Sequence, residues 1–389
     1  MEENNVMAAE DAAAVELVDA QPAVAEDTLP QKKKRKPINQ QKLQDNIWGW
    51  AFCVPLLVGT ILFVYIALVM ALMLSFTNYD SLTPQNIWEY LGKLFSSDAQ
   101  SLTRHVNLDT GEVVYDALYW YKMAFTQTRA TTNLMAIEGT EMNELGATLF
   151  NTVFYMIGIP IGMVLSMFFA VCMSRDIKGG NVFRVLYYIP CIASMISIVY
   201  TFRIMFKTQG VINQMFGSET PWIELPPEGA LRFGDGDPFW RQGLLNKLVI
   251  IIMSVWKGLG GTIILYVAGL SGVNAATKEA AQIDGASGWT IFWKVTMPDL
   301  YPVIFYNVVT SVIGGMQIYA EPELIFASTT QGVNMLTSGY VGLIWFYGIN
   351  SPAGGASYAS QGAAYGMILA VIIFVLTLFQ FWLDARKKD

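Results

Sequence analysis

The sequence predicts an all-α membrane protein with six transmembrane helices, and three observations support this. First, 53% of the 389 residues are hydrophobic and only 14% are charged, against about 25% in ordinary soluble domains. Second, several apolar segments reach the roughly 20 residues that a helix needs to cross a bilayer. Third, basic residues concentrate in alternate connecting segments, as in polytopic membrane proteins. This composition excludes a disordered protein, a disulfide scaffold and a nucleic-acid binder.

The first 46 residues are predicted to form a disordered tail that is acidic and then basic. Residues 1–30 hold eight acidic residues and no Lys or Arg, so they account for nearly all of the net charge of −7. Such a segment cannot bury enough apolar surface to offset its ordering entropy. The basic run at 32–37 could mark a nucleic-acid site. Its position shortly before an apolar segment instead favours contact with anionic lipid headgroups.

Residues 47–389 are predicted to form one membrane domain. Its spans are expected near residues 49–76, 150–174, 185–206, 247–271, 300–325 and 361–383. The first and the last contain no charged residue. The fifth is the weakest because Asn307, Gln317 and Glu321 interrupt its apolar run.

The distribution of Lys and Arg predicts that both termini are cytoplasmic. With the N-terminus inside, fourteen basic residues fall in the inside segments, which are 31–46, 175–184, 272–299 and 384–389. The outside loop 77–149 has four in 73 residues, and the outside segment 326–360 has none. This asymmetry is the positive-inside pattern.

The outside loop 77–149 is too polar for the membrane and too long for a simple turn. It contains two helical patterns rich in aromatic residues, at 87–95 and 117–125. We therefore expect a small cap on the outer face.

Metal chemistry and catalysis are not expected in this chain. It has three cysteines, Cys53, Cys172 and Cys191, all in or beside apolar runs, and one histidine, His105. One histidine cannot supply the usual ligand set of a zinc site. The sequence G-x-x-x-x-G-K-[ST], which forms a phosphate-binding loop, is absent. We therefore expect no enzyme activity and no cofactor in this chain, and any ATP hydrolysis would require a separate polypeptide.

The segment 272–299 is the most informative connection between spans. Its alanines favour a short helix up to Ile283, and Gly285 can adopt the left-handed conformation that ends such a helix. A second short helix is expected at about 287–295, stopped by Pro298, which starts the next span. Its aromatic side chains would share one face: Trp289, Phe292 and Trp293.

This helix–glycine–helix elbow has the features of a docking site. Glu279 and Asp284 can accept hydrogen bonds from Arg or Lys of a partner. Small residues would allow a partner backbone to approach closely: Ala280, Ala281, Gly285 and Ala286. An ordinary loop with helical propensity explains the same residues equally well.

The stretch EAAQIDGASGWTIFWKVTMP, residues 279–298, closely resembles the "EAA" loop of ABC importer permeases. Its DGA extension resembles the carbohydrate-uptake branch, similar to maltose and glycerol-phosphate permeases. Further segments that resemble this branch are SFTNYD (75–80), FNTVFY (150–155), RVLYYIP (184–190), TQGVINQMFG (208–217) and SVWKGLGGTIILYVAGL (254–270). The acidic tail and the longer first outside loop depart from the family.

The resemblance implies a type I ABC importer permease fold, in a bacterial plasma (inner) membrane, that moves a sugar or oligosaccharide into the cytoplasm. The implied partners are a second permease subunit, a dimer of cytoplasmic ATPases that bind ATP and Mg²⁺, and an extracytoplasmic solute-binding protein. The elbow would be the coupling helix that docks on the ATPase. The implied coupling residues are Glu279, Ala280, Ala281, Asp284, Gly285, Ala286, Phe292 and Pro298.

Polar residues inside spans are costly and mark candidate solute paths. The candidates are Lys257, Asn307, Gln317, Tyr319 and Glu321. A sugar path combines hydrogen-bonding side chains with aromatic faces. Alternatively, Lys257 could extend toward the interface, and Glu321 could lie among the headgroups. The alternative function is a stand-alone secondary transporter or channel, which would need internal repeats or an ion site at mid-membrane.

Overall fold

The structure, a computed structural model, describes residues 40–79, 92, 103–106, 113–126, 143–174, 180–223, 243–326, 337–349 and 359–387. The chain divides into two units, Met1–Phe63 and Val64–Asp389. Residues 1–39, most of the predicted tail, lie outside the described part. Helix α2 (Gln40–Thr60) begins at Gln40, inside the segment 1–46 that is predicted as the tail. Gln, Lys and Leu favour helix at this position.

The first predicted span is confirmed. Helix α2 continues through a π-helical turn, η1 (Ile61–Tyr65), into α3 (Ile66–Ser75). The stretch Trp48–Ser75 is long and apolar enough to cross a membrane.

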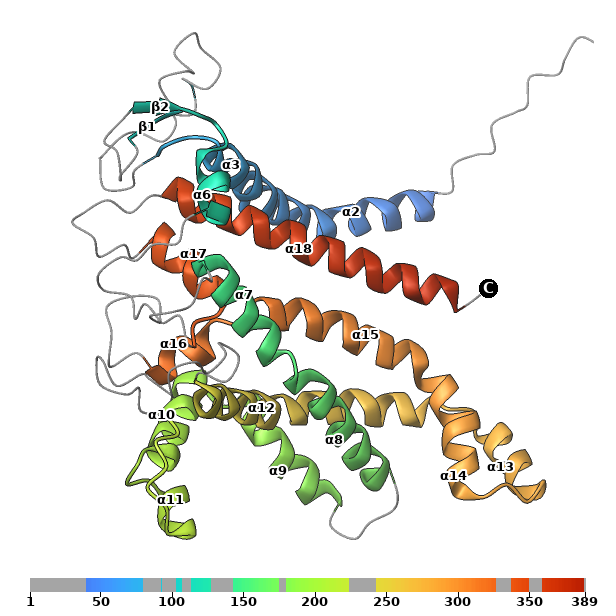
Figure 1. Ribbon diagram of the computed structural model, residues 1–389. Coiled ribbons are helices and arrows are strands. Elements are labelled where there is room, and N and C mark those ends of the chain that lie inside the picture. The colour runs from blue at the N-terminus through green and yellow to red at the C-terminus, as the bar shows by residue number, and fades with distance from the viewer. Residues whose placement is uncertain are drawn as a thin grey trace, which may run out of the picture. The chain divides into compact units, whose positions relative to one another are not determined.

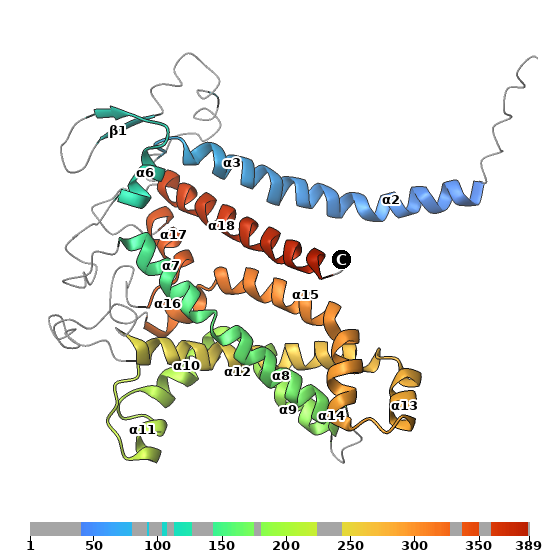
Figure 2. The same ribbon diagram turned by 45° about the vertical axis from the view of Figure 1, so that its right-hand side comes forward.

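The second and fourth predicted spans are confirmed and pack against each other. The second comprises α7 (Glu144–Tyr155) and α8 (Gly158–Met173), and the fourth is α12 (Leu244–Ser271). Their shared core includes Ala170 and Ile263, which are almost fully buried. In Figures 1 and 2, α8 crosses beside α12.

The third predicted span is broken. Helices α9 (Gly180–Ile192) and α10 (Met195–Phe206) are bent by 97° at the break between them, and a short helix, α11 (Val211–Phe216), follows. The backbone leaves the helical region at Ser194, where ψ is 133°. Serine favours such helix starts, and Pro190, one turn earlier, lacks the N–H that would support the preceding turn. The segment predicted as a span near 185–206 is therefore two helices joined at a sharp bend.

The fifth predicted span is confirmed in position. It comprises α15 (Met297–Met316) and the short helix α16 (Ala320–Phe326), with a break between them. In the described chain, five helices are long and apolar enough to cross a membrane, and the bent α9–α10 pair brings the number to six.

The sixth span, α18 (Ala359–Arg386), is confirmed and packs against α3 and the short helix α17 (Tyr340–Gly348). Helix α17 was not predicted. It approaches α18 so closely that a Cβ atom on Gly362 would lie 2.5 Å from the Cα atom of Gly348. Figures 1 and 2 show α18 running alongside α3.

The described part of the loop 77–149 contains a hairpin and a helix. Strands β1 (Arg104–Val106) and β2 (Val113–Tyr115) pair antiparallel, and this hairpin was not predicted. Helix α6 (Tyr119–Thr126) confirms the pattern at 117–125. The pattern at 87–95 lies outside the described residues, apart from Gly92.

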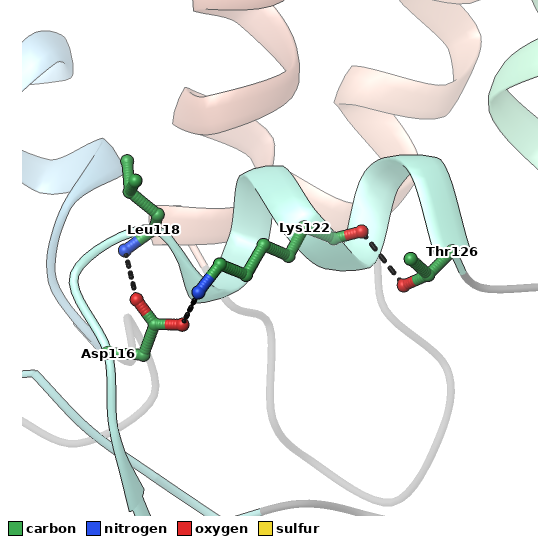
Figure 3. A network of polar contacts seen from close by, with 4 residues as sticks. All are labelled: Asp116, Leu118, Lys122 and Thr126. Carbon is green, nitrogen blue, oxygen red and sulfur yellow. Dashed lines mark hydrogen bonds and ion pairs between the residues drawn. The ribbon is translucent and has the colours of Figure 1, made fainter.

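Asp116 orders the start of α6 (Figure 3). Its carboxylate accepts hydrogen bonds from the backbone N–H of Leu118 at 2.9 Å and from Nζ of Lys122 at 2.5 Å. Within α6, Nε1 of Trp120 donates to the carbonyl of Thr77 at 2.9 Å, next to the end of α3. The backbone N–H of Tyr79 donates to Oγ of Ser360 in α18 at 2.7 Å. Helix α6 and the chain after α3 thus form an ordered cap on the ends of α3 and α18.

Candidate functional site

The elbow begins with helix α13 (Ala275–Ile283), which ends where the sequence predicts. Oδ1 of Asn274 accepts a hydrogen bond from the N–H of Ala276 at 2.9 Å and caps the start of α13. At the other end, the N–H of Ala286 donates to the carbonyl of Ala281 and the N–H of Gly285 to that of Gln282, both at 3.0 Å. This pair of bonds is the Schellman motif. It requires the left-handed conformation that Gly285 has, with φ of 77°.

Pro298 starts the fifth span, as predicted, but it does not stop the second arm of the elbow. Helix α14 (Gly288–Ile291) starts at Ser287, whose Oγ accepts from the N–H of Thr290 at 3.2 Å. A π-helical turn, η2 (Phe292–Thr296), then leads directly into α15. Pro298 lies in the first turn of α15, where a helix tolerates its missing N–H. The wide π turn relieves the clash that a proline ring makes with the carbonyl one turn earlier. The elbow is therefore continuous with the fifth span.

Three aromatic side chains cluster on the second arm, as predicted. The ring centroid of Trp293 lies 5.7 Å from that of Trp289 and 5.3 Å from that of Phe292. Trp289 is 72% exposed, and Ile283 at the tip is 87% exposed. Such large apolar side chains left open to solvent indicate a surface that a partner or the membrane interface covers.

The predicted coupling residues lie along the surface of the elbow. Glu279, Ala280, Asp284, Gly285 and Pro298 are exposed, and Ala281, Ala286 and Phe292 are half-buried. Within the described chain, the carboxylates of Glu279 and Asp284 have no ion-pair partner. They remain available to a cationic side chain of another protein.

A second feature is a cavity of about 410 Å³ between α8, α12 and α15. Small residues at every fourth position of two helices make room for it: Gly158, Gly162 and Ser166 of α8, and Ser254, Gly258 and Thr262 of α12. Its volume is within the range of about 300–1,000 Å³ typical of small-molecule sites. These residues were not predicted as site residues, although small residues spaced by four are a recognisable signal of close helix contact.

Two of the five predicted path residues, Gln317 and Glu321, line this cavity. Lys257 does not line it, but its Nζ lies 3.3 Å from Oε1 of Glu321 and 3.0 Å from Sδ of Met195. The ion pair thus joins α12 to α16 and reaches the start of α10.

The other two path residues make packing contacts away from the cavity. Asn307 is buried, and its Nδ2 donates to the hydroxyl of Tyr266 in α12 at 2.9 Å. The ring of Tyr319 lies 6.0 Å from that of Trp345 in α17. Among the described residues, no group of three or more His, Cys, Asp or Glu side chains could hold a metal ion.

Replacing Asn307 by alanine is expected to weaken the contact between α15 and α12 and to leave the solute preference unchanged. The coupling energy between Asn307→Ala and Tyr266→Phe should be about 0.6 kcal/mol, and at most about 1.7 kcal/mol, as for hydrogen bonds between membrane helices. A double-mutant cycle on unfolding in detergent measures this energy. A changed solute preference in Asn307→Ala would instead place the side chain in the path.

Comparison with known proteins agrees with this geometry. The family model described as "Binding-protein-dependent transport system inner membrane component" matches residues 158–389. The lactose transport system permease protein LacF of Rhizobium radiobacter is 28% identical over 248 residues, which are 61% of this chain and 75% of LacF. The probable ABC transporter permease protein YesP of Bacillus subtilis is 27% identical over 355 residues, which are 89% of this chain and 94% of YesP.

A solved structure shares the fold. A chain in the crystal structure of a bacterial alginate ABC transporter, in complex with an alginate pentasaccharide-bound periplasmic protein, superposes with a TM-score of 0.61. The two are 17% identical, and the match covers 90% of this chain and 98% of that chain. The predicted fold class is confirmed, and with its apolar helices this is a multi-pass membrane protein. The match to the family model covers more than half of the sequence, so the chain belongs to the family of binding-protein-dependent transport system inner membrane components.

Proposed function

We propose that the chain is the transmembrane permease subunit of an ATP-driven importer that carries a sugar or oligosaccharide into the cytoplasm. The observation that carries this proposal is the elbow. It presents two carboxylates and an exposed aromatic cluster on a rigid turn that is continuous with a span. An isolated channel or secondary transporter has no evident use for such a surface.

In this proposal the elbow lies in the cytoplasm and docks on a separate ATPase subunit. Glu279 and Asp284 would accept hydrogen bonds from Arg or Lys of the ATPase, since charge-assisted bonds of this kind are strong and directional. ATP and Mg²⁺ would be bound by a dimer of these ATPases. The two further partners are a second permease subunit and an extracytoplasmic solute-binding protein. The basic residues near the elbow and both termini support this orientation.

The names of similar proteins support a carbohydrate as the solute. They include permeases for lactose, arabinooligosaccharides and multiple sugars. The solute of the structurally similar alginate transporter is an acidic polysaccharide. Relatives thus support the class of solute and leave its charge open.

Replacing Glu279 by lysine tests the proposed docking. We expect the variant to reach the membrane at the normal level but to lose the ATPase subunit on purification, because like charges would face each other at the interface. Thr277→Lys is the control, since it places a lysine on α13 about 200° around the helix axis from position 279. Quantitative co-purification from detergent measures the effect.

Two results would contradict the proposed function. One is normal ATPase recovery and normal uptake with Glu279→Lys. The other is uptake by the wild-type chain reconstituted alone, without an ATPase, which would establish a secondary transporter or a channel.

A further inference from the structure

We infer that the cavity between α8, α12 and α15 accepts an uncharged, hydroxyl-rich sugar unit and disfavours an acidic one. The inference rests on the proposed function and names the class of solute that the path takes. It depends on which polar groups line the cavity and on where the two charges beside it are placed.

The cavity offers hydrogen bonds mainly through uncharged groups. Its polar lining includes the hydroxyls of Ser254, Thr262 and Ser311 and the amide of Gln317. Within the described chain, Oγ of Ser254 is buried and has no hydrogen-bond partner. A buried hydroxyl in this state is costly. Rotation of the Ser254 side chain into the cavity that it lines would let the hydroxyl of a bound sugar satisfy it.

The one charged side chain among the described lining residues is Glu321. Its partner Lys257 does not line the cavity, and Nζ of Lys257 is also held against Met195 of α10. A solute in the cavity therefore contacts the carboxylate of Glu321 directly. The ammonium of Lys257 affects the solute only through its ion pair with that carboxylate. A sugar hydroxyl can donate to the carboxylate, but a sugar carboxylate would face a like charge at low dielectric.

The same arrangement predicts how the sign of the electrostatic potential in the cavity can be reversed. Glu321→Gln removes the negative charge and leaves the ammonium of Lys257 without its partner carboxylate, so the cavity becomes cationic. Glu323→Gln is the comparison variant: Glu323 is in the same short helix, α16, and does not line the cavity, although its carboxylate acts electrostatically on Tyr155 of the cavity wall.

The potential in the cavity can be measured without transport. In the complete transporter, Cys53, Cys172 and Cys191 are replaced by alanine and Ser311→Cys supplies one thiol in the cavity wall. Methanethiosulfonates that carry a trimethylammonium or a sulfonate group then report the local charge. After correction for their rates with a free thiol, we expect the cationic reagent to react roughly tenfold faster. Glu321→Gln should reverse this preference, and Glu323→Gln should change it much less and without reversal.

Protection of the same thiol tests the class of solute. Glucose and glucuronate, which differ only in the oxidation of C6, are added at equal concentration. Glucose should slow the modification of the introduced cysteine more than glucuronate does, and Glu321→Gln should reverse that order. Equal rates with the two reagents, no change in Glu321→Gln, or equal protection by the two sugars would each overturn the inference.

Uptake by the complete transporter, measured in parallel, separates this inference from the proposed function. If uptake depends on the ATPase but the reagent preference does not depend on Glu321, only the inference fails. If the reagent preference behaves as expected and no ATP-dependent uptake occurs, the proposed function fails instead.

Discussion

Replacing Gly285 by proline is expected to abolish ATP-driven uptake while the chain still reaches the membrane. Gly285 has a φ of 77°, and a proline ring fixes φ near −65°. Proline also lacks the N–H that Gly285 donates to the carbonyl of Gln282 at 3.0 Å. Without this bond the Schellman motif cannot form. The angle between α13 and α14 would then no longer be fixed. Uptake by the complete transporter, normalised to the amount in the membrane, measures the effect.

Two alanine variants calibrate this result. At Gly285 no atom lies within 4 Å of an added Cβ. The cost of Gly285→Ala is therefore the left-handed conformation alone, about 1–2 kcal/mol, and uptake should be reduced but not lost. Gly288 also has open space around it and lies in the regular helix α14, so Gly288→Ala should leave uptake within about twofold, since alanine favours helix. Normal uptake with Gly285→Pro would show that the elbow does not transmit force.

Gly260→Ala is expected to destabilise the membrane domain by about 1–3 kcal/mol, as overpacking in a close-packed core does. A Cβ atom on Gly260 would lie 2.3 Å from the carbonyl oxygen of Tyr187. Because the obstacle is backbone, no side chain can rotate to make room, and α12 and α9 would have to separate. The midpoint of thermal unfolding in detergent should fall.

Gly258→Ala is the control on the same helix. No atom lies within 4 Å of an added Cβ there, so the change should be neutral or stabilising by up to about 1 kcal/mol through the greater helix propensity of alanine. A loss of stability in Gly260→Ala together with no loss in Gly258→Ala, two residues away, would be strong evidence for the contact between α9 and α12. Equal effects would contradict it.

The sequence could predict the spans because each depends on a long run of apolar residues. It could also predict the end of α13, since Gly285 is the residue type that a left-handed helix end favours. It could not predict the bend in the third span. That bend depends on the backbone conformation of Ser194, and a hydropathy pattern carries no information about backbone conformation. The continuity of the elbow with α15 was missed for a related reason, because Pro298 stops a helix only when the turn before it cannot widen.

The sequence could not predict the cavity or the ion pair beside it, for a different reason. Lys257 and Glu321 are 64 positions apart, and their contact depends on how three helices pack. Gln317 and Glu321 were predicted as path residues because of their polarity, and they line the cavity. Asn307 was predicted on the same ground and instead bonds to Tyr266. Polarity inside a span marks a residue that needs a partner, and packing decides whether that partner is protein or solute.

The π turn after α14 has a mechanical consequence. Residues 292–316 form one helical path of about 37 Å at 1.5 Å per residue. A rotation of the elbow would therefore tilt this whole helical path. A tilt of roughly 10° would displace its far end by about 6 Å, given that length. The far end carries three residues of the cavity wall, Ser311, Gly314 and Gly315. A small angular movement at the elbow would therefore be enough to change the width of the cavity.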